Sequence, residues 1–465
     1  MTNTLPSKRS EHESAVGLQK HKRTAIDVGM ALLTPIMGRE FLDKYNLRDP
    51  LNRGIKYGVK HGFSAAGAST RQFKRIQGIG KPATRLKAIS SAEGSDYFDL
   101  TPDDDQKMIV ETVKEFAEEI LRPAAHDADD VATYPPSLIA KAAELGVTAI
   151  SIPEDFDGIA EHRNTVTNAL VAEALAYGDM GLALPILAPG GVASALTHWG
   201  SADQQATYLK EFAGENIPQA CVAIAEPQPL FDPTTLKTTA VRTPSGYRLD
   251  GVKSLVPAAA DAELFIVAAQ LNGKPALFIV EASATGLTVK ADPSMGIRAA
   301  ALGRVELDKV TVPLSARLGE EDAASADTAQ IYSQAIALSR LGWAALAVGT
   351  SHAVLDYVIP YVKEREAFGE PIARRQSVAF MCANIAIELD GLRLITWRGA
   401  ARAEQGLSFA REAALAKKLG TDKGMQIGLD GVQLLGGHGF TKEHPVERWY
   451  RDLRAIGVAE GVVVL

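Results

Sequence analysis

The sequence predicts an α+β multidomain protein in which a β domain lies between two helical domains, and a basic arm, residues 1–96, precedes them. Three observations support this prediction. Apolar residues recur at three- and four-residue spacing in residues 97–218, as on one face of a helix. Residues 219–328 instead hold short β-rich runs bounded by Gly, Pro, Asp and Asn. Residues 329–465 return to long Ala- and Leu-rich helical stretches. A chain of 465 residues is also too long for one ordinary domain.

The arm differs from the rest of the chain in its charge. Residues 1–95 hold 17 Lys/Arg and 7 Asp/Glu, a balance of +10, whereas the remaining residues hold 32 and 49, a balance of −17. A basic arm on an acidic body indicates docking to an anionic surface, such as the periphery of a membrane, or to another subunit. A solvated arm without a partner is the alternative. We expect no nucleic-acid partner.

Composition is typical of a soluble globular protein, with 46% hydrophobic and 23% charged residues. Cys221 and Cys382 are the only cysteines and lie far apart, which argues against a disulfide scaffold and fits a reducing compartment. The nine histidines form no ligand-spaced cluster, so we predict no metal site. The first residues resemble no secretory signal, and the apolar run Val28–Met37 is too short to span a membrane. We therefore expect a cytoplasmic location.

In the first helical domain, Thr101 is predicted to cap a helix, with Pro102 at the first helical position. The apolar residues between Gln106 and Leu121 lie on one helical face. Further helices are predicted over Pro136–Leu145, Asn164–Tyr177 and Gln204–Phe212.

The middle residues are expected to form a β-barrel or sandwich. The predicted strands are Tyr247–Val252, Leu264–Ala268, Ala276–Val280, Gly286–Lys290 and Val305–Val312. The last domain is expected to be a four-helix bundle, with long helices over Ser333–Tyr361 and Arg375–Gly406.

The C-terminal stretch is the richest in motifs. A Gly-Gly-x-Gly turn at 436–439 allows close approach of the backbone to a partner surface or a phosphate-bearing ligand. A charged run follows, and then Glu460 stands directly before Gly461. The residues around Glu460 are apolar: Ile456, Val458, Ala459 and Val462. A partly desolvated carboxyl is a better general base near neutral pH, so Glu460 is the candidate base.

These motifs and their order resemble the acyl-CoA dehydrogenase family. The segment from Arg365 to Ile372 is similar to the family's Arg-x-x-Phe-Gly-x-Pro-Ile signature, and Glu460-Gly461 to its catalytic Glu-Gly pair. The resemblance covers residues 97–461. It implies an N-terminal helical, a middle β and a C-terminal helical domain. It also implies FAD-dependent α,β-desaturation of an acyl-CoA thioester, in fatty acid or related lipid catabolism, with electrons passing to an electron-transfer flavoprotein.

The same resemblance assigns site residues. Glu460 would remove the α-proton, its backbone N–H would bind the thioester oxygen, and Arg340 and Gly461 would contact the substrate. Ala225 and Val256 would lie at the chain's own FAD. A further set matches positions that reach the FAD of a neighbouring subunit in a dimer or tetramer, where Arg suits the pyrophosphate. It comprises Arg365, Phe368, Gln376, Gln433, Gly436 and Gly437.

The chain departs from the family in its own flavin loop. Ala225 stands where the family has a Thr, and Leu230-Phe231 replaces a small pair. Leu255-Val256-Pro257 replaces a Trp-Ile-Thr/Ser stack, and Val462 a Thr. Each change removes a hydrogen-bond donor or a ring. Three functions stay open: a complete acyl-CoA dehydrogenase, a non-catalytic or half-site subunit of a hetero-oligomeric dehydrogenase, and another flavin chemistry on the same fold, such as an oxidase.

Overall fold

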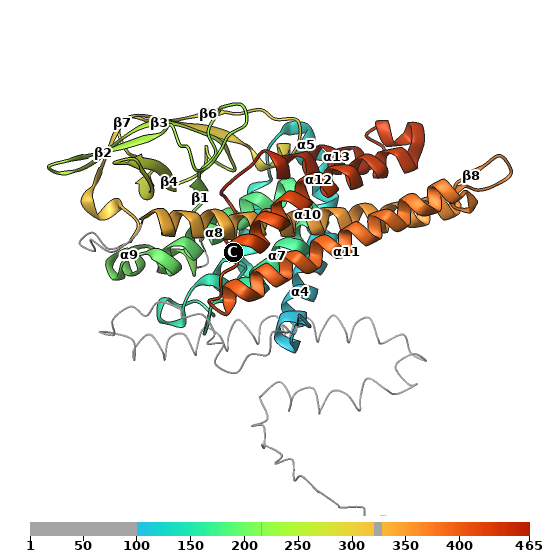
Figure 1. Ribbon diagram of the computed structural model, residues 1–465, viewed down its shortest axis with the longest axis horizontal. Coiled ribbons are helices and arrows are strands. Elements are labelled where there is room, and N and C mark those ends of the chain that lie inside the picture. Colours follow the sequence, from blue (N-terminus) through green and yellow to red (C-terminus); the bar gives the residue numbers. More distant parts are fainter. Residues whose placement is uncertain (1–99, 215, 320–327) are drawn as a thin grey trace, which may run out of the picture. The chain divides into compact units, whose positions relative to one another are not determined.

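A computed structural model describes residues 100–465, except residue 215 and residues 320–327 (Figure 1). The predicted arm, residues 1–96, lies outside these described residues, so its prediction stays untested. The predicted fold class is confirmed: helices come first, a β-sheet follows, and long helices complete the chain.

The first helix begins two residues later than predicted. The helix cap is Asp103, not Thr101, because Asp103 and Gln106 satisfy each other's backbone N–H groups at 2.7 and 3.1 Å. Thr101 and Pro102 precede the helix. The helices are α4 (Asp104–Phe116), the π turn η1 (Ala117–Leu121), α5 (Arg122–Val131), α6 (Pro136–Glu144), α7 (Thr165–Gly178), α8 (Met180–Trp199) and α9 (Ala202–Phe212), with 3-10 turns η2 (Thr148–Ser151) and η3 (Glu154–Phe156).

Helix α8 is buried along almost its whole length. In the described part of the chain it is the one helix long and apolar enough to cross a membrane, with a mean hydropathy of 1.5. However, 94% of that stretch is buried inside the protein. Asp179 caps the helix by accepting a hydrogen bond from the Leu182 N–H at 3.0 Å. Its apolarity on all sides is therefore that of a core helix.

The predicted middle β domain is confirmed, and it consists of one curled, seven-stranded sheet. Its order is β1-β4-β2-β3-β7-β6, with β5 paired to β4. The five predicted runs are all strands, and β1 and β2 are additional. Every residue of β1 is buried, so it lacks the polar–apolar alternation by which strands are recognised. The strands are β1 (Ala220–Ala223), β2 (Thr239–Thr243), β3 (Gly246–Val256), β4 (Leu264–Leu271), β5 (Lys274–Glu281), β6 (Leu287–Ala291) and β7 (Gly303–Pro313), with 3-10 turns η4 (Arg298–Ala300) and η5 (Leu314–Ala316).

In the last domain, long helices pack against one another and against α7. A hairpin joins the first two of them, at their far end from the sheet (Figure 1). The elements are α10 (Thr328–Glu364), β8 (Glu366–Ala367), β9 (Glu370–Pro371), η6 (Ile372–Arg374), α11 (Gln376–Glu404), α12 (Ala410–Leu435), η7 (Gly436–Phe440), α13 (Val446–Leu453) and η8 (Arg454–Gly457). Helix α12 was not delimited from the sequence, because its internal glycines weaken a helical pattern. They allow close packing instead: a Cβ on Gly431 would lie 2.7 Å from Val354.

Candidate active site

Glu460 lies just after α13 and η8, where the chain passes between α10 and the sheet. Its side chain is only 8% exposed. Ile456, Ala459 and Val462 are buried as the sequence predicts, but Val458 is 57% exposed. Burial of the candidate base therefore depends on the helices that pack over it as well as on its sequence neighbours.

The Glu460 carboxylate lies between two cations. Arg340 of α10 approaches it with Nη2 at 3.0 Å and Nε at 3.2 Å. Lys417 of α12 places its Nζ 3.7 Å from the same Oε1. Burial lowers the pKa of Lys417 to about 8, against the opposing effect of Glu460. The two cations balance the charge of the carboxylate, whose burial without a partner would cost several kcal/mol of folding free energy.

The backbone next to Glu460 is held by two elements, α10 and β1. Ser339 Oγ and Trp343 Nε1, both on α10, donate to the Gly461 carbonyl at 2.5 and 2.9 Å. The Val462 N–H donates to the Val222 carbonyl of β1 at 3.0 Å. Gly461 has a φ of +84°, and a Cβ there would lie 2.8 Å from the Val222 oxygen, so only glycine fits.

One backbone hydrogen-bond donor in this segment has no acceptor among the described residues. The backbone N–H of Glu460 has no hydrogen-bond acceptor in the parts of the chain that the structure describes. On the other side of the same peptide unit, the Ala459 carbonyl accepts a hydrogen bond from Lys417 Nζ. The site thus combines a buried carboxylate with a free N–H from the same residue, which suits removal of a proton next to a carbonyl group whose oxygen needs a donor.

The set predicted to reach a neighbouring subunit's FAD lies at the other end of the long helices. Arg365, Phe368, Gln376, Gln433, Gly436 and Gly437 are all exposed. The side chains of Arg365, Gln376 and Gln433 make no hydrogen bond or ion pair within the described ranges. Phe368 is 93% exposed, and Gly436 has a φ of +58°, which favours glycine.

This exposed set and Glu460 cannot act on the same reacting atoms. Arg340 and Glu364 are 24 residues apart on α10, a separation of about 36 Å at the usual helical rise. The set lies at the C-terminal ends of α10 and α12, which meet where the Tyr361 hydroxyl donates to the Leu435 carbonyl. Glu460 instead contacts Arg340 in the first half of α10. The structure therefore does not bring the two groups of predicted residues together within one chain.

The residues predicted to lie at the chain's own FAD offer few polar groups. Ala225 and Val256 are buried, 4% and 1% exposed. Neighbouring backbone donors are already used: the Ser254 N–H binds the Ala225 carbonyl at 2.9 Å, and the Leu255 N–H binds Asp292 at 3.0 Å. Pro257 has no N–H. A flavin would find no side-chain donor at Ala225, Leu255, Val256 or Pro257, whereas the exposed set has free donors suited to a pyrophosphate.

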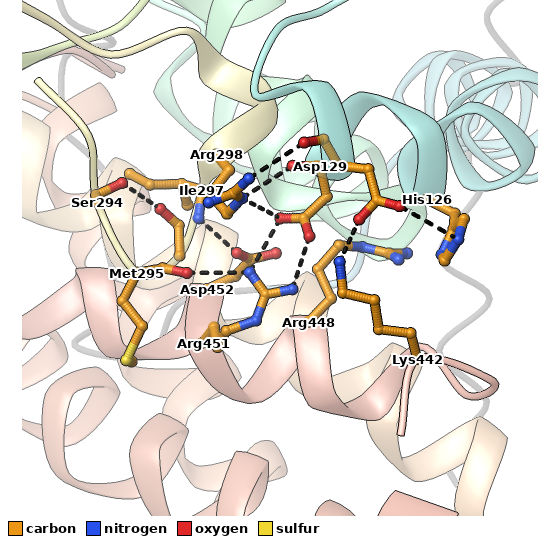
Figure 2. A network of polar contacts seen from close by, with 12 residues as sticks. His126, Asp129, Ser294, Met295, Ile297, Arg298, Lys442, Arg448, Arg451 and Asp452 are labelled. Atoms are coloured by element: carbon orange, nitrogen blue, oxygen red, sulfur yellow. Dashed lines mark hydrogen bonds and ion pairs between the residues drawn. The ribbon is translucent and has the colours of Figure 1, made fainter. Parts of the chain in front are cut away.

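A network of polar contacts fixes α13, the helix that leads to Glu460 (Figure 2). Arg451 binds Asp129 of α5 with two hydrogen bonds, at 2.7 and 3.0 Å, and reaches the Met295 carbonyl at 3.0 Å. Asp452 accepts a hydrogen bond from the Ile297 N–H at 2.5 Å. Arg448 pairs with Asp179, the cap of α8, at 2.9 Å. Residues from all three domains thus meet at α13 and set the path of the chain toward the base.

Sequence reasoning missed Lys417, Ser339 and Trp343. Lys417 shares a helix face with the buried residues Ala413 and Gly420, at four- and three-residue spacing, and this spacing is the signal that could have identified it. Among the described residues, no group of three or more His, Cys, Asp and Glu side chains is arranged to hold a metal ion.

Comparison with known proteins gives matches over most of the chain. Models of the acyl-CoA dehydrogenase N-terminal, middle and C-terminal domains match residues 103–216, 221–310 and 329–462. "Probable acyl-CoA dehydrogenase YngJ" of Bacillus subtilis is 31% identical over 78% of this chain and 96% of its own length. Butyryl-CoA dehydrogenase from Megasphaera elsdenii has a similar structure, with a TM-score of 0.71, 27% identity, and coverage of 78% of this chain and 96% of its own.

Two further solved structures bear on cofactor and electron transfer. A chain from a structure described as "Electron transferring flavoprotein of Acidaminococcus fermentans" has a TM-score of 0.72 and 28% identity, covering 78% of this chain and 96% of its own. The FAD complex of PigA has a TM-score of 0.71 and 25% identity, covering 78% and 95%. FAD is the cofactor in this group of structures. In sequence and in fold, this chain belongs to the acyl-CoA dehydrogenase family of oxidoreductases.

Proposed function

We propose that this chain catalyses α,β-desaturation of an acyl-CoA thioester, with Glu460 as the base. The observation that supports this most is the pairing of the buried Glu460 carboxylate with the free N–H of the same residue. The carboxylate takes a proton from the α-carbon, and the N–H stabilises the negative charge that develops on the thioester oxygen. FAD, when bound, supplies the acceptor for the hydride that leaves the β-carbon.

Arg340 determines when the base is free. Its guanidinium forms an ion pair with the Glu460 carboxylate, so a substrate has to separate this pair before Glu460 can remove the α-proton. The Arg340 side chain is 29% exposed and can turn toward solvent or toward the entering thioester. Lys417 is 13% exposed and stays in place. We therefore assign Arg340 to the substrate site, beside Gly461.

The electron acceptor we propose is an electron-transfer flavoprotein, in line with the likeness to the electron transferring flavoprotein structure from Acidaminococcus fermentans. We also propose that the chain works in the cytoplasm as an oligomer. Arg365 and Gln433 have free side chains at an exposed end about 36 Å from the Arg340–Glu460 pair. Such donors can bind the pyrophosphate of a flavin that is held mainly by another subunit.

A second candidate function is that of a half-site subunit in a hetero-oligomer. It is favoured by the lack of side-chain donors at Ala225, Val256 and Pro257, and by the use of the nearby N–H groups within the chain. In such an assembly this chain supplies its exposed set to a paralogous subunit with a complete flavin loop. Glu460 is then the base of a site whose own flavin is weakly held.

The test is incubation of the purified full chain, with added FAD, with acyl-CoA thioesters of increasing length and an artificial electron acceptor. Loss of one proton and one hydride makes the product two hydrogens lighter, which mass spectrometry detects. Formation of the enoyl-CoA supports the proposal. Its absence both for the chain alone and for the chain co-expressed with a paralogous dehydrogenase would overturn it. Activity only on co-expression favours the half-site subunit.

A further inference from the structure

The peptide unit between Ala459 and Glu460 is held by a charged group on one side only. Lys417 Nζ donates to the Ala459 carbonyl oxygen at 2.5 Å. The Lys417 side chain is 13% exposed, and its ammonium lies 5.9 Å from the centre of the Trp343 ring. No acceptor faces the Glu460 N–H among the residues that the structure describes.

These two facts are coupled through the geometry of the peptide bond. The described part of the chain contains no cis peptide bonds, and in a trans peptide the C=O and the N–H point in opposite directions. Fixing the Ala459 oxygen therefore also fixes the direction of the Glu460 N–H. A cation bound to the oxygen further polarises the amide, which makes its N–H a stronger donor.

We propose that Lys417 is a positioning residue that aims and polarises the Glu460 N–H as the donor to the thioester oxygen of an acyl-CoA. This inference rests on the proposed function, since it assigns a partner to the same oxygen. Lys417 does not touch the reacting atoms and acts through the Ala459–Glu460 peptide unit.

The contact distances separate this role from simple charge balance. Lys417 Nζ lies 2.5 Å from the Ala459 oxygen but 3.7 Å from the Glu460 carboxylate. Arg340 supplies the closer ion pair to that carboxylate, at 3.0 Å. The charge of Glu460 is therefore balanced mainly by Arg340, and the main partner of Lys417 is the carbonyl.

The charged groups that face Lys417 are Glu460, from the segment after α13, and Arg340, from α10. Burial, with the charge of Arg340, lowers the pKa of Lys417 to about 8, while Glu460 opposes that change. Lys417 is thus charged below this pH and loses its proton as the pH rises through about 8. Deprotonation removes the polarising charge and weakens the donor.

The experiment measures exchange of the α-hydrogens of butyryl-CoA with D2O by mass spectrometry, with the full chain, between pH 6 and 9.5. Exchange needs the base and the oxygen donor but no net oxidation. Exchange by the unchanged chain should fall above pH 8. Lys417→Met should lower it about 10-fold or more at neutral pH, because losing one oxyanion donor costs about 10²- to 10³-fold and this donor is weakened, not removed.

Lys417→Arg tests the charge itself, since Arg keeps its proton throughout this range. It should retain much of the exchange and lose the decline near pH 8. The matched control is Lys418→Met, on the next residue, which is exposed and paired with Asp422; it should behave as the unchanged chain. Thermal melting checks that each variant folds. If Lys417→Met does not fold, Lys417→Arg provides the test.

Exchange by Lys417→Met equal to that of the unchanged chain overturns the inference and leaves the proposed function standing. A decline near pH 8 that persists in Lys417→Arg does the same. Absence of exchange by the unchanged chain, both alone and co-expressed with a paralogous dehydrogenase, overturns both.

Discussion

The guanidinium of Arg340 and the carboxylate of Glu460 form a direct ion pair, 3.0 Å between Nη2 and Oε1, across 120 residues of sequence. The two groups are brought together because α10 passes beside the segment that follows α13. In the free chain this pair stabilises the fold and occupies the base at the same time. Binding of a substrate and release of the base are therefore linked events.

Replacing Arg340 with Leu should lower the free energy of unfolding. Breaking a buried pair costs about 3–5 kcal/mol, but Lys417 remains and Arg340 is partly exposed, so about 1–3 kcal/mol is expected here. Chemical denaturation measures the change. Arg340→Lys should cost less, because a cation is retained.

The matched control is the same substitution in a Glu460→Gln background. There Arg340 has no carboxylate to pair with, and its removal should cost much less. Equal losses in the two backgrounds would show that the ion pair contributes nothing to stability.

Asp452 should make stability depend on pH. It is 1% exposed, and burial together with the negative charge of Asp179 raises its pKa to about 8, from an ordinary value of 3.8. Between these two values the folded state keeps a proton that the unfolded state has lost. The contribution of Asp452 to stability is therefore full below about pH 4 and is lost as the pH rises toward 8.

The measurement is chemical denaturation of the unchanged chain and of Asp452→Asn from pH 5 to 9. Asn keeps an acceptor for the Ile297 N–H and carries no charge. The unchanged chain should lose stability relative to the variant by up to about 1.4 kcal/mol per pH unit, until the pH reaches 8. A difference between the two proteins that stays constant with pH would contradict the assignment.

The isolated chain should hold FAD weakly. Several hydrogen bonds of about 0.5–1.5 kcal/mol each are missing at Ala225, Pro257 and Val462, which weakens affinity by orders of magnitude. Flavin absorbance per chain should be substoichiometric after dialysis and should rise when a paralogous dehydrogenase is co-expressed. Stoichiometric FAD that resists dialysis in the isolated chain would instead favour a complete homo-oligomeric enzyme.

The exposed set gives this prediction a control. Arg365→Ala and Gln433→Ala should lower the flavin content of the co-expressed complex and leave the isolated chain unchanged. Arg411→Ala, an exposed arginine at the start of α12, should affect neither.

Local motifs predicted much of the fold, but the contacts of the base were not predictable from them. The Glu460-Gly461 pair and the apolar residues before it placed a buried carboxylate correctly. That carboxylate is surrounded by Arg340 and Lys417, which are 120 and 43 residues away in sequence. Strand β1 was missed because all of its residues are buried, and α12 because its glycines serve helix packing.

The basic arm predicts binding to anionic surfaces. With a balance of +10, residues 1–95 should attach the chain to vesicles containing acidic lipids at low salt, and salt should release it because exposed charges are screened within about 10 Å at 0.1 M. Co-sedimentation of the full chain and of a chain lacking residues 1–95 measures this. Equal binding by both would leave the arm without a docking role.

The central claim is that Glu460 removes the α-proton, and Glu460→Gln tests it most directly. Gln keeps the size of the side chain and can accept a hydrogen bond from Arg340, but it is no base. The measurement is α-hydrogen exchange of butyryl-CoA together with turnover to the enoyl-CoA, on a variant whose folding and acyl-CoA binding have been verified. We predict a loss of about 10²- to 10⁴-fold in both rates. Rates equal to those of the unchanged chain would contradict the assignment of Glu460 as the base.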